Sequence, residues 1–515
     1  MAAPSIDQPD FRALLVTPYG FQNQGVRLLA AELRRAGFDA RVLFFKAWVN
    51  NNVRPPTARE LALFDAHVAE TRPALIGFGF GSPYLRIVTE LTARVRANSD
   101  AFVIWGGVHP TISPEDGIDA ADAVCVGEGE QPLLELAGAL AAGRSPDDIA
   151  NLWVRRNGRI TRNALRPLIQ NLDALAYDRL FDVPLAWIER GRLAAGDPLA
   201  DSAVYRVFAS RGCPFHCAFC YNSQYRAIYH GLGAYHRVRG VESLLGELET
   251  ARRRLPRGRR IRFDDDSFIF PRSWIDEFVA RYPGRVGLPF DLLLNPEAYD
   301  PEALRLLRDA GLCHIQAGVQ SASPEELPRD YDRCGSNEHV LALARTARSL
   351  GVEITFDLIL DNPLASAADK DATLDLLLEL PRPFNLFLYS LTPFPKSELA
   401  TKLLAAGVIS ENDIEGRATK SFRQFRLSFD YPRPAEETFY AALISLTSKR
   451  FIPRGLIRWL ARRPVLRRSP GPLKLLARIA NLVKLIGIAV RMARRGELSR
   501  FHLREYVTLR GRLVQ

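Results

Sequence analysis

The chain has 515 residues, of which 47% are hydrophobic, and its formal net charge is +11 at neutral pH. This length and composition suffice for about three domains with sizeable cores, and neither internal repeats nor low-complexity segments appear. No signal peptide or apolar run of membrane-spanning length is visible, so we expect a cytoplasmic protein.

The first 145 residues alternate strand-like and helix-like segments. Apolar runs typical of buried parallel strands lie at 13–17, 40–45, 75–78, 102–105 and 123–126. Helical patterns separate these runs at 24–36, 58–70, 84–96 and 131–142. Five such units predict a flavodoxin-like α/β domain over residues 1–145, with ligands at the carboxyl ends of its strands.

Two loops at those predicted strand ends are rich in glycine. One runs Gly106-Gly107-Val108-His109 and the other Gly127-Glu128-Gly129. Glycine permits close backbone approach to a bulky ligand, although any domain of this type needs turns there. No G-x-G-x-x-G opens the first helix, so the pattern gives little support to a dinucleotide-binding domain.

A stretch with several prolines, 146–203, is expected to form an irregular linker. The chain beyond it again alternates strands and helices. The expected strands are 204–208, 260–263, 288–293, 314–318, 353–358 and 385–389. Six strand–helix units predict a partial (βα)6 barrel of the TIM type over residues 204–400, with its active-site loops at the strand carboxyl ends.

Three cysteines lie directly after the first strand of the predicted barrel. Cys213, Cys217 and Cys220 have the spacing C-x-x-x-C-x-x-C. Three thiolates so close together suit three irons of a four-iron, four-sulfur cluster and leave one iron open. The alternatives are chance clustering or a zinc site, but zinc requires four ligands and His216 is too close to its neighbours to be a comfortable fourth. The other cysteines, Cys125, Cys313 and Cys334, are expected to be buried thiols in a reducing compartment.

This cysteine motif resembles the signature of the radical S-adenosylmethionine (SAM) superfamily. The resemblance implies a [4Fe-4S] cluster whose open iron chelates SAM, and a deoxyadenosyl radical that abstracts hydrogen from a substrate. It also implies that Phe219 packs near the adenine. Segments at two later strand ends resemble parts of the SAM pocket, with Asp265, Asp266, Gln320 and Ser321 as expected contacts.

The acidic triplet that contains Asp265 and Asp266 also has a simpler interpretation, as a solvated turn or a helix cap. The chain departs from the family pattern at two other strand ends. The third strand ends in Asn295, where many relatives carry an arginine, and the fifth is followed by Asp361-Asn362-Pro363 in place of a Gly-x-Pro turn.

The order of the modules resembles cobalamin-dependent radical SAM enzymes, in which a cobalamin-binding domain precedes the radical domain. This resemblance makes Gly106, Gly107, Gly127, Glu128 and Gly129 the expected cobalamin contacts. The position at which other cobalamin proteins place a cobalt-binding histidine is occupied by Gln22. Cobalt is therefore expected to lack a protein histidine. His109 lies near the predicted ligand edge, where a loop histidine is more often a hydrogen-bonding residue than a metal ligand.

The resemblance implies a methyltransferase acting on an unactivated carbon of a small-molecule or lipid-like substrate, with flavodoxin or ferredoxin as electron donor. Two alternatives stay open. One is a radical oxidative cyclase or ring-rearranging enzyme that transfers no methyl group. The other, from a different class, is an iron–sulfur regulator without turnover.

The region 401–515 is expected to be mostly helical and basic. Residues 449–515 contain 18 Lys and Arg against two acids, a net charge of +16, which leaves −5 for the rest of the chain. An amphipathic helix with a cationic face is predicted over 472–490. It would pack on the barrel with its basic face in water, or contact an anionic membrane surface at the inner face of the membrane. Nucleic acid is not expected as a partner, because no aromatic interleaving or known binding module is present.

Overall fold

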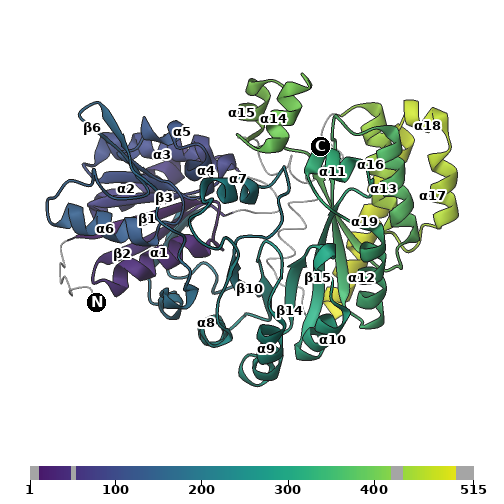
Figure 1. Ribbon diagram of the computed structural model, residues 1–515, viewed down its shortest axis with the longest axis horizontal. Coiled ribbons are helices and arrows are strands. Elements are labelled where there is room, and N and C mark those ends of the chain that lie inside the picture. The colour runs from purple at the N-terminus through teal and green to yellow at the C-terminus, as the bar shows by residue number, and fades with distance from the viewer. Residues whose placement is uncertain (1–10, 48–53, 419–432, 495–515) are drawn as a thin grey trace.

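The computed structural model describes residues 11–47, 54–418 and 433–494. Two α/β domains lie side by side, and helices of the C-terminal region cover the far end of the second (Figure 1). The chain passes once from the first domain to the second.

The first domain is built on one nine-stranded sheet with the order β7-β6-β5-β4-β3-β1-β2-β8-β9. Its five central strands are parallel and follow the order β5-β4-β3-β1-β2, which confirms the flavodoxin-like prediction. These strands are β1 (Arg12–Pro18), β2 (Asp39–Phe45), β3 (Leu75–Gly79), β4 (Phe102–Gly106) and β5 (Ala123–Cys125).

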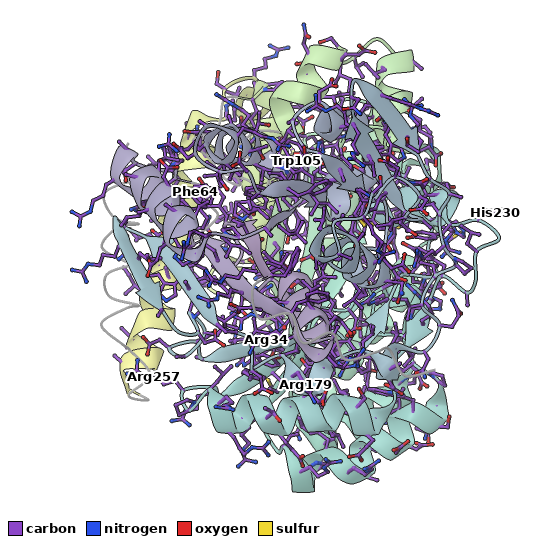
Figure 2. All side chains as sticks on the ribbon, turned by 90° about the vertical axis from the view of Figure 1, so that its left-hand side faces the viewer. Arg34, Phe64, Trp105, Arg179, His230 and Arg257 are labelled. Atoms are coloured by element: carbon purple, nitrogen blue, oxygen red, sulfur yellow. The ribbon has the colours of Figure 1, made fainter. Side chains whose placement is uncertain are left out.

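Helices cover both faces of this sheet. One core joins the sheet to α1 (Gln24–Arg35) and α6 (Glu130–Ala141), and a second joins it to α2 (Ala58–Thr71) and α3 (Leu85–Asn98). Phe64 and Trp105, both labelled in Figure 2, are fully buried in the second of these cores. Burial on both faces explains why the central strands are apolar throughout.

The expectation of an irregular linker over 146–203 was wrong. The segment supplies β6 (Leu152–Arg156) and β7 (Arg159–Arg162) to one edge of the sheet, and β8 (Leu185–Glu189) and β9 (Arg192–Ala195) to the other. These strands are short, and most of their residues are only half-buried or exposed. Their apolar pattern is therefore weaker than that of the central strands.

The second domain is an open, fully parallel six-stranded sheet with the order β10-β13-β14-β15-β16-β17, as the partial barrel predicts. The strands are β10 (Val204–Val207), β13 (Arg260–Phe263), β14 (Phe290–Leu294), β15 (Leu312–Gln320), β16 (Glu353–Leu360) and β17 (Asn385–Ser390). The connecting helices are α8 (Val241–Arg254), α9 (Arg272–Arg285), α10 (Pro301–Ala310), α12 (Asn337–Ser349) and α13 (Ala367–Glu379).

The C-terminal region is helical, as expected. Its helices are α14 (Glu398–Ala405), α15 (Glu411–Ala418), α16 (Ala435–Thr447), α17 (Arg454–Ala461), α18 (Pro464–Arg468) and α19 (Gly471–Arg494). The helix predicted over 472–490 is α19, and it packs against the core of the second domain, whereas its predicted membrane contact stays a prediction. Its packed face is a narrow seam of Leu473, Ala477 and Ala480, while larger apolar side chains face outward. Within the described residues, no helix is both long and apolar enough to span a bilayer.

Candidate functional site

The two domains enclose a joint cavity of about 530 Å³, whose lining is mostly apolar. The first domain contributes the loops that follow β1, β3, β4 and β5, together with the start of α1. The second contributes the start of the cysteine loop, at Phe208 and 210–212, and helix α7 (Tyr221–Ile228). A cavity of this size, at a domain interface and at the carboxyl ends of parallel strands, is typical of a cofactor or substrate site.

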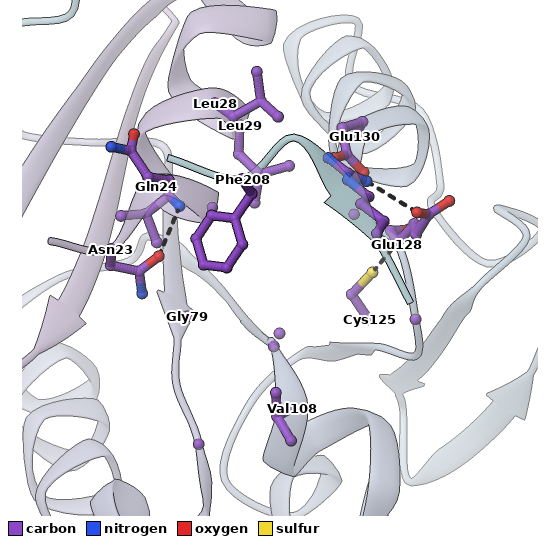
Figure 3. Close-up of a pocket in the computed structure, with 18 of the residues that line it drawn as sticks. Asn23, Gln24, Leu28, Leu29, Gly79, Val108, Cys125, Glu128, Glu130 and Phe208 are labelled. Carbon is purple, nitrogen blue, oxygen red and sulfur yellow. Dashed lines mark hydrogen bonds and ion pairs between the residues drawn. The ribbon is translucent and has the colours of Figure 1, made fainter. Parts of the chain in front are cut away.

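Phe208 connects the two halves of this cavity. It follows the last residue of β10, five residues before Cys213, and is 40% exposed. Figure 3 shows its ring projecting between the loop at Gly79 and the residues around Val108. An aromatic side chain of the second domain therefore forms part of the wall on the first domain's side.

The cysteine loop is held at its base by Asp265. The carboxylate Oδ1 accepts hydrogen bonds from the backbone N–H groups of Ala209 (3.0 Å) and Ser210 (2.6 Å), and from the Ser210 hydroxyl. Further along, the Ser223 hydroxyl donates to the carbonyl of Cys217 (2.7 Å). The loop backbone is thus fixed from both ends, which keeps the three cysteines in place.

The cysteines themselves are poorly solvated. Cys213 and Cys217 are buried, and Cys220 is half-buried at the N-cap of α7. Burial, together with smaller contributions from the charges of Asp266 and Cys217, raises the pKa of Cys213 to about 11 and that of Cys220 to about 12. Thiols in this environment become thiolates only when a metal replaces their protons.

This donor set fits an iron–sulfur cluster better than a single ion. Among the described residues, no group of three His, Cys, Asp or Glu side chains is placed to hold one metal ion. A four-iron cluster has a different requirement, because each thiolate binds a different iron. Three thiols on one fixed loop meet that requirement.

Arg333 contacts this site and was missed in the sequence. Its Nη1 donates to Cys217 Sγ (3.3 Å), while Nη2 donates to the carbonyl of Gly318 (2.6 Å) and to Asn295 Oδ1 (3.0 Å). The guanidinium thus lies at the end of β14, where Asn295 stands in place of the family's arginine. Arg333 follows α11 (Glu326–Tyr331), so no local motif marks it.

The expected SAM contacts have different surroundings. Asp266 lines the cavity and accepts a hydrogen bond from the Tyr221 hydroxyl (2.9 Å). Asp265 is buried and holds the cysteine loop, with its second oxygen lacking a partner among the described residues. Ser321 is buried and donates to Glu326 (2.5 Å), and Gln320 has a positive φ of 64°. Neither Gln320 nor Ser321 lines the joint cavity, so their contact with SAM stays a prediction.

Phe219 lies on the other side of the loop. Its ring meets that of Tyr331 edge to face at 5.6 Å, beside a small core formed with α11 and α14. The predicted proximity of Phe219 to the adenine stays a prediction.

The glycine loops line the cavity as expected, but the reason for glycine differs from position to position. A Cβ on Gly107, whose φ is +98°, would lie 2.8 Å from the carbonyl oxygen of Phe80. A Cβ on Gly127 would overlap the hydroxyl of Tyr229. At Gly106 and Gly129 a Cβ would make only ordinary contacts with the protein. The protein's own packing therefore requires glycine at 107 and 127, whereas 106 and 129 leave open backbone towards the cavity.

His109 and Gln22 are directed elsewhere. His109 does not line the cavity but is buried, with Nδ1 3.1 Å from the Ser82 hydroxyl and Nε2 3.3 Å from Asp116. Gln22 donates to Ser202 (3.4 Å). The structure thus gives His109 the role of a hydrogen-bonding core residue, and its predicted contact with cobalamin finds no support in this geometry.

Glu128, an expected cofactor contact, is engaged by the protein. Its Oε1 accepts from Arg211 and Arg237 (both 2.9 Å) of the second domain, and its Oε2 accepts from the Ile169 N–H (2.8 Å). Arg211 also pairs with Glu130 at 2.5 Å. Although Glu128 lines the cavity, its carboxylate serves mainly to join the two domains.

A row of tyrosines on α7 also crosses between the domains. Tyr225 and Tyr229 reach the glycine loops, where the Tyr229 hydroxyl accepts from the Glu128 N–H (2.8 Å). Tyr221 and Tyr235 line the cavity beside them. Tyr221, Tyr225 and Tyr229 follow one another at intervals of four residues, and this spacing is the sequence signal for a common helix face. Helix α7, which is capped by Cys220 and ends next to Tyr229, therefore links the cysteine loop to the glycine loops.

Comparisons with known proteins agree with this arrangement. Residues 13–137 match the B12 binding domain, and residues 207–374 match the radical SAM superfamily. The chain therefore carries a B12-binding domain ahead of a radical SAM domain. Its cofactors are a [4Fe-4S] cluster, SAM and cobalamin.

Individual relatives are distant. An uncharacterized methyltransferase of Pyrococcus horikoshii is 26% identical over 59% of this chain and 63% of its own length. An anaerobic magnesium-protoporphyrin IX monomethyl ester cyclase of Rubrivivax gelatinosus is 26% identical over 59% of this chain and 52% of its own length. The chain thus spans less than two thirds of either relative.

The structure of the radical SAM methyltransferase TsrM from Kitasatospora setae, with cobalamin and a [4Fe-4S] cluster bound, has the same fold. It aligns with a TM-score of 0.60 and 16% identity over 92% of this chain and all of TsrM.

Proposed function

We propose that the chain is a cobalamin-dependent radical SAM methyltransferase, acting on an unactivated carbon of a small-molecule or lipid-like substrate. The observation that carries this proposal is the joint cavity, which borders the glycine loops of the B12-binding domain and the base of the cysteine loop. A methyl donor and a radical source that face one cavity can act on the same substrate carbon.

When bound, SAM and the cluster supply a hydrogen-abstracting radical, and cobalamin supplies a methyl group. The chain's own residues position these groups and exclude water. Cys213, Cys217 and Cys220 would hold the cluster, and the glycine loops would hold cobalamin. Phe208 and the tyrosines of α7 form an aromatic wall, which suits an apolar substrate.

The proposal is tested with the anaerobically reconstituted full chain, reduced by flavodoxin or ferredoxin as the proposed electron donor. SAM with an isotopically labelled methyl group is supplied together with a small-molecule and lipid extract. We expect 5′-deoxyadenosine and a product that carries the labelled methyl group. Both should disappear in Cys217→Ala and persist in the matched control Cys313→Ala, whose thiol lies on β15.

Other outcomes would select the alternatives. Formation of 5′-deoxyadenosine with no label in any product would contradict methyl transfer and favour a cyclase-like reaction, for which the similarity to the Rubrivivax gelatinosus cyclase is the specific support. Absence of SAM consumption in a fully loaded protein would favour a regulator. Turnover without cobalamin would also overturn the proposal.

A further inference from the structure

Helix α19 has two apolar faces, and only one of them is packed. Leu473, Ala477 and Ala480 form the inner face, each at most 2% exposed. On the opposite face Leu475, Ile479, Leu482, Val483 and Ile486 are 47–57% exposed. Spacings of three and four residues place these five side chains in one stripe along the helix. A helix surface that only met water would carry polar side chains at such positions.

The neighbouring helices add to this exposed apolar surface. On α17, Trp459 is 52% and Leu456 39% exposed, and on α18 Val465 is 74% exposed. The guanidinium of Arg463 lies over the Trp459 ring, 4.2 Å from its centroid. An exposed tryptophan with a stacked arginine is typical of the boundary between water and lipid headgroups.

The charge of this region has one sign. Residues 449–494 contain 13 Lys and Arg and no Asp or Glu. Five of its described arginines are exposed: Arg450, Arg458, Arg462, Arg463 and Arg468. The surface therefore combines apolar side chains with a strong positive potential.

The surface is anchored to the second domain. Asn481 and Ser445 of α16 are hydrogen-bonded at 3.3 Å, and Lys484 donates to Asn385 of β17 (2.7 Å). Because β17 is the last strand of the open sheet, the helices cover an edge of the catalytic domain. A partner bound here would be held in a fixed orientation to the barrel.

We propose that α17, α18 and α19 form a docking surface for an anionic lipid bilayer, with the stripe on α19 inserted at the headgroup level. Arginine and lysine attract anionic lipid, while the apolar stripe and Trp459 enter the interface. A second copy of the chain would present the same positive charge and be repelled. A nucleic acid would contact the basic residues but would leave the apolar stripe exposed to water. The inference does not depend on methyl transfer.

Co-sedimentation of the full chain with vesicles tests the proposal. Phosphatidylcholine vesicles with and without phosphatidylglycerol are compared at low and high salt. We expect binding to the anionic vesicles that weakens as salt is raised. Ile479→Glu and Val483→Glu should each lower the partition coefficient about tenfold or more, because each inserts a charge where an apolar side chain should be buried.

Val408→Glu is the matched control. Val408 is 43% exposed, close to the 47% of Val483, but lies between α14 and α15 outside the basic region. It should leave vesicle binding unchanged, and all variants should keep the wild-type circular dichroism spectrum. Equal binding of Val483→Glu and wild type would overturn the proposal, as would no binding to anionic vesicles at low salt. A wild-type dimer in sedimentation velocity that Val483→Glu dissociates would assign the stripe to self-association.

Discussion

Single side chains decide the environment of the proposed cluster. The cysteines are close in sequence, but the cation beside them, Arg333, is 116 residues from Cys217. Hydrogen bonds and charges at the cysteine sulfurs of an iron–sulfur cluster tune its reduction potential. The positive charge of Arg333 therefore stabilises the reduced form of the cluster, which carries more negative charge than the oxidised form.

Replacing this cation should change the potential without removing the cluster. In Arg333→Gln we expect iron content close to wild type and a more negative cluster potential, measured by a redox titration followed by electron paramagnetic resonance. Arg329→Gln is the control, because Arg329 is paired with Asp330 and its side chain is 45% exposed. The same potential in wild type and Arg333→Gln would contradict the assigned role.

A glycine of the cofactor loops and a glycine on a helix should respond differently to mutation. Gly127→Ala should destabilise the protein by about 2 kcal/mol, because the residue has φ +91° and a Cβ would displace Tyr229. Gly138→Ala, on α6 with no atom near the new methyl group, should stabilise by about 0.5–1 kcal/mol. The thermal unfolding midpoints of the two variants measure these changes in stability. An unchanged midpoint for Gly127→Ala would show that the loop shifts to accommodate the new methyl group.

At the scale of elements, the packing of α16 against α19 buries a lysine. Lys449 is 5% exposed and donates to the Ser448 hydroxyl (3.2 Å). Burial, followed by the charge of Lys484, lowers its pKa to about 7. The fold thus favours the neutral amine, whereas the unfolded chain keeps its proton up to about pH 10.4.

This difference makes stability depend on pH. Between pH 7 and about 10.4 the unfolded chain binds more protons at this site than the folded protein, so stability rises with pH there. Below pH 7 Lys449 is protonated in both the folded and the unfolded states, so the folded protein bears the full cost of burying this charge. Lys449→Met should therefore raise the free energy of unfolding at pH 6 by on the order of 2 kcal/mol, with a smaller gain at pH 9.5. A gain that did not shrink with pH would exclude a buried charge as its cause.

At the scale of the whole molecule, a cluster of ion pairs joins the two domains. Arg211 and Arg237 of the second domain meet Glu128 of the first, with side chains 22%, 6% and 15% exposed. When one partner of such a partly desolvated ion pair is removed, the other charge is left without compensation and the protein loses stability. The cavity lies beside these pairs, so the relative placement of the domains sets its shape.

Glu128→Gln should loosen this junction. We expect a loss of about 3 kcal/mol of stability, because Arg237 would lose its anion and Arg211 would keep only Glu130. The radius of gyration from X-ray scattering should rise as the domains separate. Glu135→Gln is the control, since Glu135 pairs with Arg166 at 2.5 Å, outside the radical SAM domain. An unchanged radius in Glu128→Gln would show that the other contacts between the domains, such as those of α7, suffice to hold them together.

The sequence by itself predicted the order of the central elements, which the structure confirms, and it is the source of the proposal that the three cysteines hold the cluster. Parallel strands buried on both faces leave continuous apolar runs, and three cysteines within eight residues form a local signal. The four edge strands over 152–195 were missed, because half-buried edge positions accept polar residues and leave no such run.

Only the tertiary structure decided how the site is completed. Arg333 lies at Cys217, Tyr229 at Gly127 and Arg211 at Glu128, across separations of 83 to 116 residues. It also showed that α19 packs through Leu473, Ala477 and Ala480 and exposes most of its other large apolar side chains. Such contacts depend on which surfaces meet when the elements pack, and a local pattern carries no information about its distant partner.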